Sequence, residues 1–144
     1  AGGIASGEAM LAAMALGAEG IQAGTLFALT EESSASEEFK KKCTELAEGD
    51  TMLCLKKIAP TRLIKNDLYT KVAEAEDKGA TADELREILG RAASKRGIFE
   101  GDMESGELEI GQIASDIKSI KPVSEVMKEL ISGFEKAKER VAQL

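Results

Sequence analysis

The first part of the chain combines one helical stripe with one short apolar run. Its apolar residues repeat at the spacing of one helix face: Met10, Leu11, Ala13, Met14 and Leu16. Ser6 is the N-cap expected for this helix, and Gly17 is its expected end. Positions 20–24 (GIQAG) are short and apolar, which is typical of a buried parallel strand. This pattern predicts a helix followed by a strand, with a glycine turn on each side.

Further along the chain, the pattern predicts helices around one β-like run. Ser36 is the expected N-cap of one helix, and Thr81 with Glu84 forms a capping box at the start of another. Pro122 stands where its fixed φ favours the start of the last helix. The predicted helices cover 36–47, 62–78, 81–95, 110–120 and 123–144, the predicted strand covers 51–55, and 97–107 reads as a loop.

Two glycine turns are the candidate ligand-binding elements of the chain. Gly2-Gly3 and Gly24-Thr25 each follow a predicted strand of one β/α unit, so both turns lie at the same edge of the sheet. Such turns offer free backbone N–H groups near a helix N-terminus, which suits a phosphate dianion. The expected donors are the N–H groups of Gly3, Ile4, Gly24 and Thr25, with the Thr25 hydroxyl in addition. Glycine permits the close approach, since a Cβ would occupy the space of a phosphate oxygen.

Three runs of the sequence carry a resemblance to a known family. They read AGGIASG, LGAEGIQAGTLFALTEES and FEGDMESGELEIGQIASDIKSIKPVSEV. They resemble the flavin-binding and C-terminal segments of the nitronate monooxygenases (2-nitropropane dioxygenases), whose superfamily includes the FMN-dependent enoyl-ACP reductases. Leu26 stands where that family commonly has Arg, and Ser36 where it commonly has His. A phosphate site built from backbone needs neither side chain, so the flavin interpretation holds.

The resemblance implies an α/β fold: the C-terminal part of a (β/α)8 TIM barrel. It would hold the last two β/α units with the FMN phosphate loops in 1–36, a mostly helical cap-like segment in 37–108, and C-terminal helices that return to the barrel in 109–144. About six β/α units would precede this part and be its partner. Ala1 begins inside a strand-to-loop motif, and two parallel strands are too little sheet for an independent core. We therefore expect the chain alone to be inactive.

The function implied is that of an FMN-dependent oxidoreductase that oxidises alkyl nitronates with O₂. One alternative is an FMN-dependent enoyl-ACP reductase that uses NAD(P)H and an enoyl thioester. Another is a non-catalytic helical interaction module, which the many predicted helices favour. The family's catalytic base is a His on an earlier barrel loop, so no catalytic side chain is assigned in this chain. The expected FMN-binding residues are Gly2, Gly3, Ile4, Gln22, Gly24, Thr25, Gly111 and Gln112.

Two glutamines in this set have two interpretations each. Gln22 falls on the same side of the predicted strand as Gly24, so it either faces the flavin or is a core glutamine bonded to nearby backbone. Gln112, next to Gly111, either lies near the cofactor or is a solvated residue at a loop-to-helix turn.

Composition narrows the classes of partner and chemistry. The 144 residues carry a net charge of -7, which argues against nucleic acid or an anionic membrane as partner. No apolar run approaches the roughly 18 residues that span a bilayer. The sequence has no histidine, which excludes a serine–histidine triad or a His-ligated zinc within the chain but leaves cofactor chemistry open. We expect no bound metal, and the sequence is compatible with a homo-oligomer.

Several charged and sulfur-containing residues have a structural explanation. Cys43 and Cys54 lack CxxC spacing and are predicted to be buried, reduced thiols, which suits a cytoplasmic protein. The lysines at 40–42 are predicted to form a solvated face. The acidic pairs at 31–32 and 37–38 stand at helix starts, where the helix dipole explains them better than a metal does.

Overall fold

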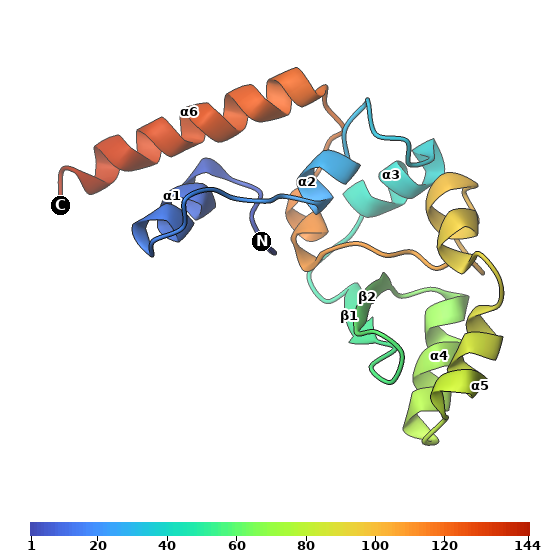
Figure 1. Cartoon of the computed structure of the whole chain (residues 1–144). Helices are drawn as coiled ribbons and strands as arrows, with labels where there is room; N and C mark the ends of the chain where they lie inside the picture. The colour runs from blue at the N-terminus through green and yellow to red at the C-terminus, as the bar shows by residue number, and fades with distance from the viewer.

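A computed structural model describes residues 1–144, and Figure 1 shows their arrangement. Six helices, two strands and two short non-α turns follow one another along the chain. The helices are α1 Gly7–Ala15, α2 Thr25–Ala28, α3 Glu37–Thr44, α4 Asp67–Asp77, α5 Ala82–Leu89 and α6 Val123–Val141. The strands are β1 Thr51–Cys54 and β2 Thr61–Ile64, and the short turns are the π-helix η1 Lys95–Phe99 and the 3-10 helix η2 Gln112–Asp116.

The predicted helix starts are confirmed by their side-chain hydrogen bonds. The Ser6 hydroxyl accepts from the N–H of Ala9 at 3.2 Å, and the Ser36 hydroxyl accepts from the N–H of Phe39 at 3.2 Å. Thr81 forms the predicted capping box at the start of α5. Pro122 directly precedes α6, as predicted. The starts at Ser6, Ser36 and Thr81 were predictable because each of these caps uses a partner three residues away.

The predicted helix over 62–78 is wrong in its first part. Thr61–Ile64 is instead β2, which pairs antiparallel with β1 so that Thr51 lies opposite Ile64. The helix begins only after Asn66, whose side-chain oxygen accepts from the N–H of Tyr69. Adjacent apolar residues fit a strand and a helix equally well, and here the pairing with β1 decides. The predicted strand over 51–55 is confirmed as β1.

Two other predicted helices are shorter than expected. The helix predicted over 81–95 ends at Leu89, because Gly90 adopts a φ of 67° and turns the chain away. The helix predicted over 110–120 is only the short 3-10 turn η2. Part of the predicted loop over 97–107 is helical, since η1 extends to Phe99.

The predicted parallel strand over 20–24 is not formed. No residue of this segment takes part in a β-bridge, and the sheet consists of β1 and β2 alone. A parallel strand exists only through hydrogen bonds to a neighbouring strand, and no other segment of the chain pairs with this one. The segment instead runs as irregular chain from Gly17 to α2.

The small sheet lies between two hydrophobic clusters. Leu63 and Ile64 are adjacent in β2 and therefore face opposite sides. Ile64 joins the first cluster, which packs between α2, α3 and η2: Leu29, Ala35, Phe39, Cys43, Leu46, Ile64, Leu108, Ile110 and Ala114. Leu63 joins the second, under α4 and α5: Cys54, Leu55, Leu63, Leu68, Val72, Leu85 and Ala93. The first cluster includes residues from all three segments expected from the sequence, which are 1–36, 37–108 and 109–144. It therefore does not separate these segments, and the division at 36 and 108 stays a prediction.

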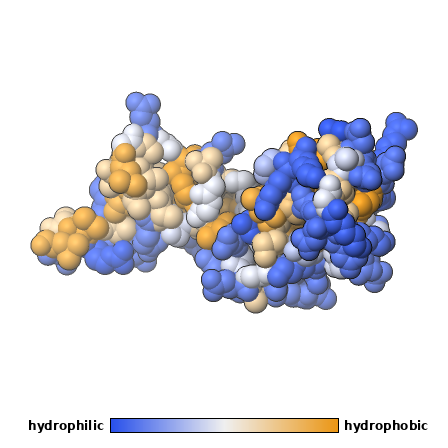
Figure 2. Space-filling view, turned by 90° about the horizontal axis from the view of Figure 1, so that it is seen from below, coloured by the Kyte–Doolittle hydropathy of each residue, from blue (hydrophilic) through white to orange (hydrophobic).

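Helices α1 and α6 form a layer of their own beside this core (Figure 1). The two helices approach closely because α1 has a glycine, Gly7, where it crosses α6. An ideal Cβ on Gly7 would lie 2.0 Å from the backbone nitrogen of Phe134. The layer leaves large apolar side chains exposed, including Leu16, Ile131 and Val141. Figure 2 shows hydrophobic colour gathered over this end of the molecule.

The lysine cluster at 40–42 is not a uniformly solvated face. Lys40 is buried, and its ammonium donates to the carbonyl of Glu31 and to the carboxylate of Glu37, both at 3.2 Å. The correction follows from packing, since the Lys40 stem lies beside Phe39 on the buried side of α3. Cys43 and Cys54 are both buried and unpaired in disulfides, as predicted. None of the helices combines the length and the hydropathy of a membrane span.

Candidate functional site

Three segments that are distant in sequence line one hollow of about 310 Å³. They are the N-terminal glycine turn, the loop before α2, and the segment that leads into η2. We call this space the glycine-loop hollow, and its lining residues are Ala1, Gly2, Gly3, Ile4, Gln22, Ala23, Gly24, Thr25, Gly111 and Ile113. Every residue expected to bind FMN lines it except Gln112. The fold therefore brings the two predicted glycine turns together, although the strand predicted between them is absent.

The glycine-loop hollow presents backbone donors that have no partner. The N–H groups of Gly3, Ile4, Gly24 and Thr25 donate to no acceptor within the chain. Gly2 and Gly3 adopt φ angles of 93° and 69°, a region that side chains rarely tolerate, so the sharp turn there requires glycine. Residues that line the hollow therefore carry backbone N–H groups that are free to donate, and an anion is a suitable acceptor for such groups.

Gly24 is different, because neither its conformation nor its packing requires glycine. Its φ is -84°, and an ideal Cβ built on it would meet no protein atom within 4 Å. That Cβ would project into free space beside residues that line the glycine-loop hollow. A side chain at this position is therefore compatible with the fold and would compete only with something bound there.

The Thr25 hydroxyl joins two of the three lining segments. It accepts a hydrogen bond from the N–H of Gly111 at 3.0 Å, across a large separation in sequence. This bond closes the hollow on the side of η2. Sequence reasoning predicted both residues for the site but not the bond between them, since nothing local signals a contact over such a distance.

A second hollow of about 420 Å³ adjoins the first and shares Gly3 and Ile113 with it. Gln112 lines this second space, together with Glu48 and Asp116. The two hollows differ in charge: no charged side chain lines the glycine-loop hollow, whereas two carboxylates border its neighbour. An anionic group is therefore favoured in the first hollow and disfavoured in the second.

The two glutamines both lie on the surface. Gln22 is exposed, lines the glycine-loop hollow and makes no side-chain hydrogen bond within the chain, so the interpretation as a bonded core glutamine is wrong. Gln112 is exposed at the first position of η2. Both amides are free to bind a ligand or water.

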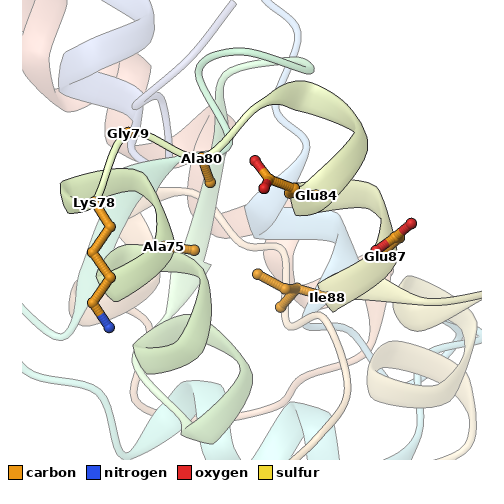
Figure 3. Close-up of a pocket in the computed structure, with 7 residues that line it drawn as sticks. All are labelled: Ala75, Lys78, Gly79, Ala80, Glu84, Glu87 and Ile88. Atoms are coloured by element: carbon orange, nitrogen blue, oxygen red, sulfur yellow. The ribbon is translucent and has the colours of Figure 1, made fainter.

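A larger hollow, about 720 Å³, lies elsewhere, in the open angle between α4 and α5 (Figure 3). Its polar groups serve structural tasks. The Glu84 carboxylate accepts from the N–H of Thr81 at 2.7 Å, and the Lys57 ammonium donates to the carbonyls of Gly79 and Ala80. Lys78 directly follows α4 and lies across the angle from the acidic side chains of α5 (Figure 3). We interpret this space as the gap between the two helices of a helical hairpin, with no ligand-binding role.

Neither thiol has the surroundings of a nucleophile. Burial raises the pKa of Cys43 to about 12, and burial followed by the nearby carboxylates of Glu76 and Glu107 raises that of Cys54 to about 11. Neither residue lines the glycine-loop hollow. No group of three or more carboxylates or thiols is arranged to hold a metal ion. No nucleophilic or ionisable side chain therefore lines the glycine-loop hollow.

Solved structures with similar folds place this arrangement in context. FabK from Thermotoga maritima superposes with a TM-score of 0.90 at 33% identity, over 99% of this chain and 45% of that chain. A nitroalkane oxidase from Streptomyces ansochromogenes superposes with a TM-score of 0.72 at 26% identity, over 97% of this chain and 40% of that chain. The chain therefore has the α/β fold of the corresponding part of these proteins.

Relatives found by sequence point the same way. A probable nitronate monooxygenase of Staphylococcus saprophyticus is 35% identical over 101 residues, which are 67% of this chain and 28% of that protein. Another, from Staphylococcus aureus strain Newman, is 43% identical over 53 residues, which are 37% of this chain and 15% of that protein. The chain spans less than half the length of each of these proteins.

The sequence model of the family described as nitronate monooxygenase matches residues 1–133, which is most of the chain and includes every lining residue of both hollows. The chain belongs to the nitronate monooxygenase family.

Proposed function

We propose that this chain is part of an FMN-dependent oxidoreductase that oxidises alkyl nitronates with O₂, and that it binds the phosphate of FMN. Membership of the nitronate monooxygenase family supports the reaction class. The observation that carries the phosphate assignment is the meeting of the two glycine turns at the glycine-loop hollow.

The residues present fit a phosphate group. Four backbone N–H groups without partners line the hollow, and an anion supplies the acceptors that they lack. No carboxylate lines the space to repel it. The glycine at position 24, which the fold itself does not require, keeps open the room that a phosphate oxygen needs.

Within the reaction, the tasks of this chain are binding and orientation. FMN, when bound, carries electrons between the nitronate and O₂. The N–H groups of Gly3, Ile4, Gly24 and Thr25 hold the phosphate end in place and thereby fix the position of the rest of the cofactor. Gln22 and Gln112 extend the polar contact surface from there. We assign no proton transfer to this chain, since no ionisable side chain lines the glycine-loop hollow.

The assignment is tested by comparing FMN with riboflavin, which lacks the phosphate. The protein is residues 1–144 joined to the part of the Thermotoga maritima FabK chain that they do not cover. We expect Gly24→Val to weaken FMN binding by about 2–4 kcal/mol, because a branched side chain displaces a charged acceptor from its donors. Riboflavin binding should change little.

Gly20→Val is the matched control for this experiment. Gly20 also has open space where its Cβ would be, but it does not line the hollow. Equal FMN affinity of Gly24→Val and the parent protein would refute the phosphate assignment. An equal loss for riboflavin would show that the substitution acts on the fold and not on the phosphate.

The second candidate function is that of an FMN-dependent enoyl-ACP reductase, which the sequence also resembles. It is kept because the superfamily of the nitronate monooxygenases, which the three sequence runs resemble, includes these reductases. Turnover of propyl nitronate with O₂, measured beside turnover of an enoyl thioester with NADH, separates the two. A helical interaction module without flavin would show neither activity and no flavin absorbance.

A further inference from the structure

We propose that Gly111 is a positioning residue, whose N–H aims the Thr25 hydroxyl as a donor to the phosphate. This inference rests on the proposed function, because it assigns a role at the same site. It extends that proposal by connecting the phosphate site to the sheet in the middle of the chain, which lies outside both glycine turns.

The hydrogen bonds of Thr25 define the direction of its hydroxyl. A hydroxyl has one hydrogen to donate and two lone pairs to accept with. The N–H of Gly111 occupies one lone pair at 3.0 Å, and the hydroxyl hydrogen has no acceptor within the chain. Since Thr25 lines the glycine-loop hollow, the free hydrogen is available to a phosphate oxygen there.

Gly111 is held in place by the sheet. The segment directly before it runs antiparallel to β2: the N–H of Ile64 donates to the carbonyl of Leu108 at 3.0 Å, and the N–H of Ile110 donates to the carbonyl of Arg62 at 3.2 Å. Leu108 and Ile110 also belong to the first hydrophobic cluster. The position of the Gly111 N–H is therefore fixed by the core, whereas α2 is only a single turn.

The close contact leaves no room for a side chain on Gly111. An ideal Cβ there would lie 2.5 Å from the Thr25 hydroxyl oxygen but 3.6 Å from the Thr25 Cβ. Gly111→Ala must therefore displace the hydroxyl. In a Thr25→Ala protein the same substitution meets only an ordinary van der Waals contact, so its effect should disappear.

The experiment measures binding of inorganic phosphate to residues 1–144 joined to the part of the Thermotoga maritima FabK chain that they do not cover, because residues 1–144 alone expose large apolar side chains on the α1–α6 layer. Hydrogen–deuterium exchange of the glycine turns is followed during titration with phosphate, against chloride at equal ionic strength. We expect Thr25→Val and Gly111→Ala each to weaken phosphate binding about tenfold, the loss of one hydrogen bond to a charged group. Thr25→Ser, which retains the hydroxyl, should bind like the parent protein.

The double variant provides the decisive comparison. Thr25→Ala with Gly111→Ala should bind phosphate no more weakly than Thr25→Ala alone, and exchange at Gly111 should be faster in Thr25→Val than in Thr25→Ser. Gly20→Ala is the control for an added methyl group elsewhere, and circular dichroism verifies the fold of each variant. Additive losses at Thr25 and Gly111, or parent-like binding by Thr25→Val, would overturn the positioning role.

The same titration separates this inference from the proposed function. If phosphate protects the turns of the parent protein and Gly24→Val abolishes that protection, the phosphate site stands whatever the Thr25 and Gly111 variants do. If phosphate does not protect the turns of the parent protein at all, both the site and the positioning role fail.

Discussion

At the scale of single residues, Cys43 and Cys54 are thiols that the fold keeps unreactive. Their pKa values of about 12 and about 11 leave almost no thiolate at neutral pH, and the thiolate is the reactive form. We expect an aromatic disulfide reagent to label neither thiol in the folded protein and both in denaturant. Rapid labelling without unfolding would contradict this expectation.

Glu107 is a second residue whose ionisation the fold controls. Its buried carboxylate accepts a hydrogen bond from the Ser94 hydroxyl at 2.7 Å. The Glu109 carboxylate lies 3.2 Å from that Ser94 hydroxyl oxygen. Burial is the largest cause that raises the pKa of Glu107; the Ser94 hydrogen bond opposes it and Glu109 adds to it. The folded state thus holds this proton more tightly than the unfolded chain. The stability that the protonated Glu107 contributes is fully present below the ordinary carboxyl pKa. It is lost as the pH rises through the raised pKa of the folded state.

Glu107→Gln tests this sign. A neutral amide avoids the cost of a buried charge and can still accept from Ser94. We expect the variant to unfold at a higher temperature than the parent protein at pH 8, with a gap that shrinks as the pH falls toward the ordinary carboxyl pKa. Glu45→Gln, at an exposed site, is the control and should show no such trend. A gap that widens toward acid would mean that the sign is wrong.

At the scale of elements, the α1–α6 layer depends on one close crossing. A Cβ on Gly7 would lie 2.0 Å from the Phe134 nitrogen and 2.6 Å from the Leu130 carbonyl oxygen. Gly7→Ala must push the helices apart, which we expect to cost about 1–3 kcal/mol, as overpacking does elsewhere. Denaturant unfolding with amide exchange in α6 measures the loss. Gly20→Ala adds the same methyl group in open space, so a similar loss there would point to glycine content as the cause.

At the scale of the whole molecule, the apolar surface of the α1–α6 layer is the dominant feature. Leu16 is 91% exposed and Val141 is 53% exposed, and Figure 2 shows hydrophobic colour gathered at this end beside hydrophilic atoms. Contiguous exposed apolar surface favours association. We expect residues 1–144 alone to sediment as self-associated species. We also expect them to retain no FMN, because the two hollows of about 310 and 420 Å³ supply few walls for a ring system.

Complementation tests this expectation. The part of the Thermotoga maritima FabK chain that residues 1–144 do not cover is supplied as a second chain. Sedimentation should then show a defined complex, and flavin should copurify with it. A flavin-loaded monomer formed by residues 1–144 alone would show that they build a complete site.

Much of the local structure was predictable from the sequence. Ser6, Ser36 and Thr81 cap helices as expected, since each cap bonds to an N–H three residues further on. The glycine turns were identified as one site, and the fold brings them to one hollow. That they bind FMN stays a prediction, which the variants of Gly24 test.

The remaining features depended on neighbours that are distant in sequence. β2 is a strand because β1 pairs with it, whereas no segment pairs with positions 20–24, which therefore form no strand. Lys40 is buried because α3 packs with that side inward. The bond between Thr25 and Gly111 is of the same kind. The sequence by itself determined the caps and the glycine turns, because these follow from residues a few positions apart. Only the tertiary structure decided which groups meet, because pairing and burial depend on segments that the chain brings together from far apart.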